Sequence, residues 1–266
     1  MHLKRWLTAV IGIPLLVIII GPAPRWVFAL LLLSVSIISL SEFYRITSPD
    51  LPRKVRWLCY LLTFVLFFLI FFRQFMVVPA IIVLFAFLIM AYYMFSHSIP
   101  SRIWTADIGK TLLGAIYAVL PISLLLLMDL NPEGKAWIFF LLAVIFANDT
   151  GALYCGKLFG KHKLYKTISP NKTWEGAVGG LITSLLIGLI FLRLWPFQQV
   201  DVEIICLIIL LSVSAQIGDL SESMIKRNHG IDDSGFLLPG HGGFLDRIDG
   251  LLFAIPILYI YSLWTL

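Results

Sequence analysis

Three aspartates near the end of the chain have the type and spacing that suit a metal ion. Asp219, Asp246 and Asp249 lie within or at the ends of apolar stretches, in a chain of 266 residues of which 60% are hydrophobic and only 13% are charged. Asp246 and Asp249 are i and i+3, so a helix would place them on one face. Mg²⁺ prefers octahedral oxygen ligation and keeps several waters while it bridges substrate phosphates. These carboxylates therefore predict a Mg²⁺ site.

The same carboxylates could instead be neutralised by bases that are close in sequence. A carboxylate at the centre of a membrane span costs about 2.5–3.5 kcal/mol, so each one needs a partner. Asp246, for example, could pair with Lys226 or Arg247. A pairing of this kind would explain one aspartate, but three of them beside a glycine-rich turn favour the metal site.

Glycine and basic residues near these aspartates suit the binding of phosphate groups. In "PGHGG" the glycines flank His241, and small residues let a backbone approach a phosphate and leave N–H groups free to bind it. The same spacing fits an ordinary re-entrant turn equally well. Lys172 in "SPNKTWEG" precedes a predicted helix, with Thr173 as a candidate cap and Glu175 in the first turn. The start of this helix is a second place that favours an anion.

Long apolar helices must position these residues. Apolar runs recur along nearly the whole chain, and about 20 such residues cross the hydrocarbon core as a helix. They show no alternating polarity, and a lipid-exposed backbone must satisfy its own hydrogen bonds, so strands are not expected. We predict an all-α integral membrane protein with about nine transmembrane helices, at 6–22, 26–41, 57–72, 75–95, 108–128, 136–156, 175–195, 203–221 and 249–266.

The distribution of basic residues predicts the orientation of the chain in the membrane. With the N-terminus in the cytoplasm, most of the 20 Lys and Arg residues lie in cytoplasmic loops, as the positive-inside rule requires. The net charge of +5 then suits anionic lipid headgroups and phosphorylated substrates. Nucleic acid is not an expected partner, because no basic stripe with interleaved stacking aromatics is present.

Specific polar clusters are confined to the second half of the chain. Residues 1–140 contain apolar spans and short turns, and we expect them to serve lipid contact, packing and dimer contacts. Residues 141–266 contain "FANDTGALYCGKLFGKHK", "SPNKTWEG" and "SAQIGDLSESMIKR", which all fall on the predicted cytoplasmic side. We therefore expect 141–266 to be the catalytic transmembrane region.

The motifs "NDTGAL", "SPNKTWEG", "SMIKR" and "DSGFLLPGHGGFLDRIDG" closely resemble those of the bacterial phosphatidate cytidylyltransferase family, also called CDP-diacylglycerol synthases. The resemblance is specific over 147–253 and rests elsewhere on length and span number. It implies an enzyme of phospholipid biosynthesis that joins CTP and phosphatidic acid into CDP-diacylglycerol and releases pyrophosphate. It also implies a homodimer in the bacterial inner membrane, with a cytosol-facing polar cavity and a divalent metal held by signature aspartates.

The resemblance gives roles to the candidate residues. Asp219, Asp246 and Asp249 would surround Mg²⁺, with a second, monovalent or divalent, cation left open. Asn148 and Asp149 would line the cavity, either as polar neighbours of the metal or as contacts to the nucleotide. The remaining candidates for catalysis or for phosphate and substrate binding are Lys172, Ser223, Lys226, Arg227, Asp233, His241, Gly242, Gly243 and Arg247.

One residue departs from the family pattern. The family usually has Lys directly before the Asp of "DSG", whereas "GIDDSG" places Asp232 before Asp233. A carboxylate in place of a cation would remove an attraction to phosphate and add a repulsion. We therefore assign no role to Asp232 and expect Lys172, Lys226, Arg227 and Arg247 to compensate.

Two other functions fit parts of the same pattern. A CTP-dependent polyprenol or phytol kinase would share the nucleotide and the membrane but transfer the γ-phosphoryl group. An ion-coupled secondary transporter would place ionisable groups such as Asp219 on broken helices in repeated halves, and no corresponding broken pair is seen in the N-terminal half.

Overall fold

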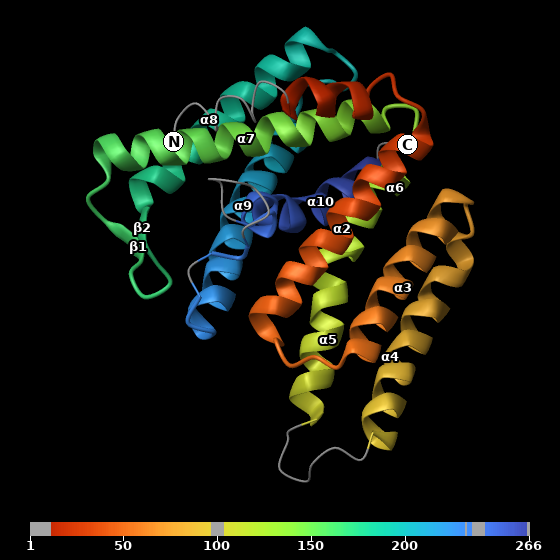
Figure 1. The fold of residues 1–266 in the computed structure, drawn as a ribbon. Coiled ribbons are helices and arrows are strands. Elements are labelled where there is room, and N and C mark those ends of the chain that lie inside the picture. Colours follow the sequence, from red (N-terminus) through yellow and green to blue (C-terminus); the bar gives the residue numbers. More distant parts are fainter. Residues whose placement is uncertain (1–11, 97–103, 232, 236–242, 265–266) are drawn as a thin grey trace. The chain divides into compact units, whose positions relative to one another are not determined.

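The computed structural model describes residues 12–96, 104–231, 233–235 and 243–264. Figure 1 shows that helices make up nearly all of this chain, which confirms the all-α class. Seven helical segments among the described residues are long and apolar enough to cross a membrane: Arg25–Thr47, Arg53–Phe71, Phe75–Phe95, Trp104–Met128, Gly134–Phe159, Trp174–Leu194 and Val202–Asn228.

Three of the predicted spans differ from this pattern. The first six residues of the first span, 6–22, lie outside the described residues, and residues 12–20 are helical. The fifth is divided into α5 (Trp104–Ala118) and α6 (Leu120–Met128). Pro121 stands in the first turn of α6 and has no N–H to donate to the preceding turn, which accounts for the break. The last span is present as the shorter helix α10 (Asp249–Trp264).

The described chain forms two compact units. The first unit contains Met1–Leu127 and Asp233–Leu245, and the second contains Met128–Asp232 and Asp246–Leu266. The described residues 233–235 and 243–245 therefore belong to the same unit as helices of the N-terminal half. The boundary that we predicted at residue 140 concerns the division of function and stays a prediction.

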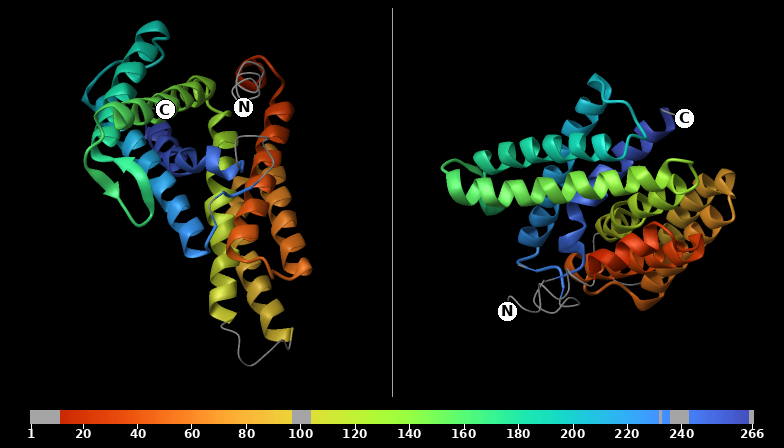
Figure 2. Two further views of the ribbon diagram at one scale, coloured as in Figure 1. Left: turned by 60° about the vertical axis from the view of Figure 1, so that its left-hand side comes forward. Right: turned by 90° about the horizontal axis from the view of Figure 1, so that it is seen from above.

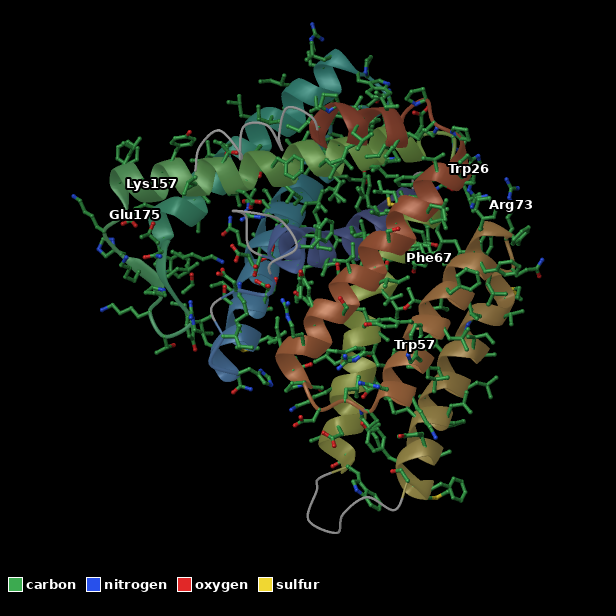
Figure 3. All side chains as sticks on the ribbon, in the orientation of Figure 1. Trp26, Trp57, Phe67, Arg73, Lys157 and Glu175 are labelled. Atoms are coloured by element: carbon green, nitrogen blue, oxygen red, sulfur yellow. The ribbon has the colours of Figure 1, made fainter. Side chains whose placement is uncertain are left out.

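The first unit is built on α2 (Arg25–Thr47). This helix packs against α3 (Arg53–Phe71) and α5, and α3 packs in turn against α4 (Val78–Phe95), which follows the short turn η1 (Phe75–Val77). Phe43 and Tyr44 of α2 are fully buried, and the Tyr44 hydroxyl donates to the Thr111 carbonyl of α5 at 2.7 Å. By contrast, Trp57 is exposed at the start of α3, where Figure 3 labels it.

The second unit is built on the helix pair α7 (Gly134–Phe159) and α8 (Trp174–Leu194). The two helices lie side by side in Figures 1 and 2. Glycines make the close approach possible, because a Cβ on Gly151 would meet the Thr183 side chain and one on Gly179 would meet Cys155. Helix α9 (Val202–Asn228) packs on both α7 and α8, and α10 packs on α9.

A short hairpin joins α7 to α8, between the predicted spans 136–156 and 175–195, where no strand was expected. Strand β1 (Lys163–Tyr165) pairs antiparallel with β2 (Ser169–Thr173). The pairing satisfies backbone groups that a free loop would leave to water. The predicted cap of α8 is confirmed, since the Thr173 side chain accepts a hydrogen bond from Gly176 N at 3.1 Å. In the same way, Asp201 caps α9 by accepting from Ile204 N.

Candidate active site

The second unit contains a cavity of about 580 Å³. Residues of α7, the hairpin, α8 and α9 line it, so both ends of the α7–α8 connection and the middle of α9 contribute. Figure 3 labels Lys157 near the end of α7 and Glu175 at the start of α8, in the part of the unit that carries the hairpin. The polar lining comprises Asn148, Asp149, Lys157, Ser169, Asn171, Lys172, Thr173, Gln216 and Asp219.

Asn148 is the centre of a hydrogen-bond network beside this cavity. Its side chain is buried, and its Oδ1 accepts from the Ser212 hydroxyl at 2.7 Å and from Gln216 Nε2 at 3.0 Å. Its Nδ2 donates to Asp149 Oδ1 at 3.2 Å. Gln216 Nε2 also donates to the Ala177 carbonyl, which can only accept. The orientation of Asn148 and Gln216 is therefore fixed, and Asn148 in turn orients Asp149.

Lys172 and Asp219 form an ion pair within the cavity lining. Lys172 Nζ lies 2.5 Å from Asp219 Oδ2, and both side chains are partly open to solvent. Asp149 lies within electrostatic range of both residues and of Arg247. The cavity thus presents two carboxylates and a lysine at one place. The lysine is suited to bind a phosphate, and the carboxylates are suited to bind its counter-ions.

Lys226 lies between two carboxylates. Its ammonium group is 2.6 Å from Asp246 Oδ1 and 2.7 Å from Glu222 Oε2. All three side chains are largely buried, and only 1% of the Glu222 side chain is exposed. The pairing of Asp246 with Lys226, which the sequence left open as an alternative to metal binding, is present in this structure.

Asp249 begins α10 in a crowded setting. The residue is 9% exposed, and its Oδ1 accepts from Gly250 N at 2.8 Å. Gly218 of α9 lies against the Asp249 carbonyl, since a Cβ at Gly218 would stand 2.5 Å from that oxygen. Asp219, Glu222 and Asp149 act on the Asp249 carboxylate electrostatically. The carboxylates of this region therefore outnumber the two lysines, Lys172 and Lys226, that pair with them.

The donor set fits a hard divalent cation in kind, although the carboxylates are not gathered around one point. Among the residues that the structure describes, no group of three or more His, Cys, Asp or Glu side chains is close enough to hold a metal ion. Two of the three predicted ligands, Asp219 and Asp246, form ion pairs with lysines. Metal binding at these aspartates stays a prediction.

The other predicted residues have varied placements. Arg227 Nε donates to the Ile168 carbonyl in the hairpin turn at 3.5 Å, and Ser223 lies one turn beyond Asp219 on α9. Arg247 is exposed in the short turn η2 (Leu245–Arg247). Asp233 and Gly243 belong to the first unit. His241 and Gly242 lie outside the described residues, as does Asp232.

Sequence reasoning missed two residues of this region. Gln216 is a polar residue inside an apolar span, and this polarity was a usable signal. Glu222 is an acidic residue directly after the predicted span 203–221, but the sequence alone gave no sign that it shares Lys226 with Asp246.

Comparisons with known proteins agree with the motifs. The model of the Cytidylyltransferase family matches residues 3–264. A phosphatidate cytidylyltransferase of Staphylococcus saprophyticus is 41% identical over 173 residues, which are 64% of this chain and 66% of that protein. The Bacillus subtilis protein of the same name is 40% identical over 154 residues, 58% of this chain and 57% of the relative. The match thus spans just under two thirds, or less, of these curated relatives.

Proposed function

Because this chain belongs to the Cytidylyltransferase family, we propose that it transfers the cytidylyl group of CTP to phosphatidic acid, giving CDP-diacylglycerol and pyrophosphate. The name of the relatives, phosphatidate cytidylyltransferase, supports this substrate pair. The observation that carries the proposal is the cavity in which Lys172 and Asp219 meet the Asn148 network.

The cavity suits a nucleotide in size and lining. Its volume of about 580 Å³ lies within the range of about 300–1,000 Å³ that is usual for small-molecule sites. Oriented amides and carboxylates line one side, and Lys172 offers a cation to phosphate. The surrounding helices expose large apolar side chains such as Leu153 and Val178, so acyl tails can remain in a lipid-like environment beside the cavity.

The reaction that these residues would promote is an in-line displacement. A phosphatidate oxygen attacks the α-phosphorus of CTP, a new P–O bond forms, and the bond to the bridging oxygen of pyrophosphate breaks. Negative charge moves onto the departing pyrophosphate. Lys172 and Lys226 would stabilise that charge, and the fixed Asn148 and Gln216 side chains would hold the nucleotide in position. Positioning and electrostatics supply most of such a catalysis.

Asp219, Asp246 and Asp249 would hold Mg²⁺. When bound, the ion would neutralise charge on the phosphate oxygens. The support is the hard oxygen donors and the excess of negative charge around Asp249. The lysines that now pair with Asp219 and Asp246 would then be released toward the phosphates. We also propose that a second cation binds in the same acidic region.

We extend the proposal to the orientation and assembly of the chain. The polar residues would face the cytosol from the bacterial inner membrane, with the N-terminus cytoplasmic, and two copies would form a homodimer. Support for the orientation comes from the basic hairpin region, where Lys161, Lys163 and Lys166 are exposed next to the cavity-lining strand β2.

Product identity tests the proposal. Purified protein in detergent is given CTP labelled in the cytidine and either phosphatidic acid or a polyprenol as acceptor. We expect cytidine label in lipid with phosphatidic acid alone. Phosphoryl transfer to the polyprenol, or solute uptake by vesicles without turnover, would contradict it in favour of a kinase or a transporter.

A further inference from the structure

Helix α2 carries a buried carboxylate that holds two distant parts of the chain. Glu42 is the one acidic residue of this helix, and it is 4% exposed. Its Oε2 accepts from Leu245 N at 2.7 Å and from the Ser234 hydroxyl at 3.3 Å. Both donors belong to the same compact unit as α2, although they follow it by about two hundred residues.

Arg45 strengthens the same attachment from one turn further along α2. Its Nη2 donates to the Ser234 carbonyl. The ends of the segment also touch one another, because a Cβ on Gly243 would meet the Ser234 hydroxyl and Gly235 N. A Cβ on Gly235 would meet Glu42 Oε1 and Arg45 Nη2. We call Ser234, Gly235, Gly243 and Leu245 the neck.

Packing alone does not explain a charge at this position. Replacing a buried ion by a well-packed apolar residue is often neutral or stabilising, so stability alone does not account for a carboxylate here. The carboxylate can instead serve to position the backbone. It accepts several hydrogen bonds at once, so it can join two donors from different segments. One group on helix α2 thereby holds both Ser234 and Leu245.

We propose that Glu42 is a positioning residue for the cytidylyl transfer and that Arg45 assists it. The neck is directly preceded by Asp233 and directly followed by Asp246, to which the proposed function gives roles in substrate and metal binding. Fixing the backbone of the neck reduces the conformational freedom that Asp233 and Asp246 would otherwise lose when substrate binds. The inference rests on the proposed function, and it gives residues 1–140 a part in the reaction.

The test compares variants of Glu42 in the full-length protein. Glu42→Leu removes both hydrogen bonds, whereas Glu42→Gln keeps one acceptor oxygen and the side-chain shape. Ser39→Ala is the matched control, because Ser39 is equally buried on α2 but donates only to the Val35 carbonyl of its own helix. Hydrogen exchange of the peptide containing the Leu245 amide, kcat and KM for CTP, and thermal unfolding are measured for each.

In Glu42→Leu we expect exchange at Leu245 to rise about tenfold or more and kcat/KM for CTP to fall about tenfold or more, the scale of one lost charge-assisted hydrogen bond. Glu42→Gln recovers part of both effects, and Ser39→Ala matches the wild type. The proposal is overturned if Glu42→Leu matches Ser39→Ala in both readouts, or if turnover falls without faster exchange at Leu245.

Gly235→Ala is a second variant in case Glu42→Leu does not fold. It adds a methyl group directly against Glu42 and Arg45. It should therefore also raise the exchange rate at Leu245 and lower kcat/KM for CTP. Normal exchange and turnover in Gly235→Ala would overturn the proposal. If the wild type forms no cytidine-labelled lipid, the proposed function fails, and exchange at Leu245 still decides whether Glu42 holds the neck.

Discussion

The ammonium group of Lys226 lies 2.6 Å from Asp246 and 2.7 Å from Glu222, so one cation serves two buried carboxylates. Asp246 belongs to the turn before α10 and Glu222 to α9, and the lysine therefore joins two elements of the second unit. Under the proposed function, the same three groups would change partners when a cation or a phosphate binds. The stability and the activity of the protein should thus depend on Lys226 in different ways.

Replacing Lys226 by Met should destabilise the second unit. The change leaves Glu222 and Asp246 buried without their shared cation, and breaking a buried ion pair typically costs about 3–5 kcal/mol. Thermal unfolding in detergent measures the loss. Lys226→Arg keeps the charge and should lose much less. An unchanged unfolding temperature in Lys226→Met would contradict the pairing.

Asp246→Asn and Asp249→Asn should each lower turnover of labelled CTP by at least about a hundredfold, because removal of one electrostatic group at a transition state costs about this much. Both variants should still fold, since Asn keeps the side-chain shape. Asp201→Asn is the control, because Asp201 caps α9 and Asn caps equally well. Near-normal turnover in both site variants would remove these residues from the reaction.

Mg²⁺ should stabilise the protein when CTP is present. A ligand that binds only the folded state raises stability by RT ln(1 + [L]/Kd), which is about 2.7 kcal/mol at a hundredfold excess over Kd. We expect chelation by EDTA to abolish both turnover and the thermal shift, and Asp219→Asn to lose the shift. A shift of wild-type size in Asp219→Asn would show that this aspartate does not hold the ion.

Gly180→Ala should disturb the cavity through the α7–α8 contact. A Cβ on Gly180 would stand 2.8 Å from both the backbone and the side-chain oxygens of Asn148, so the helices must separate. Overpacking of this kind costs about 1–3 kcal/mol. Thermal unfolding and KM for CTP should both change. Gly109→Ala in α5 is the comparison, because no atom lies within 4 Å of its added methyl group; equal effects of the two changes would refute the packing argument.

The sequence predicts the parts of this fold that depend on local pattern. Apolar length alone locates α7, α8 and α9, and local capping chemistry identifies Thr173. The pairing of Lys226 with Asp246 was visible only as one of two alternatives. Choosing between them requires the packing of α10 on α9, which no local pattern contains.

Glu42 shows why the remainder could not be predicted. The second span was expected to end at residue 41, which would place Glu42 in a loop where an acidic residue needs no explanation. Helix α2 continues to Thr47, so Glu42 is buried, and its partners are remote in sequence. The hairpin of β1 and β2 was missed for a related reason, since its short strands lack the alternation that marks a half-buried strand.

The fate of the two ends of CTP tests the central claim most directly. Wild-type protein is incubated with phosphatidic acid and Mg²⁺, and with CTP that carries one label in the cytidine and a different label in the γ-phosphate. The account predicts that the cytidine label enters lipid while the γ-phosphate label is released as pyrophosphate, with both labels leaving CTP at equal rates. The γ-phosphate label in lipid with cytidine left in water would contradict it.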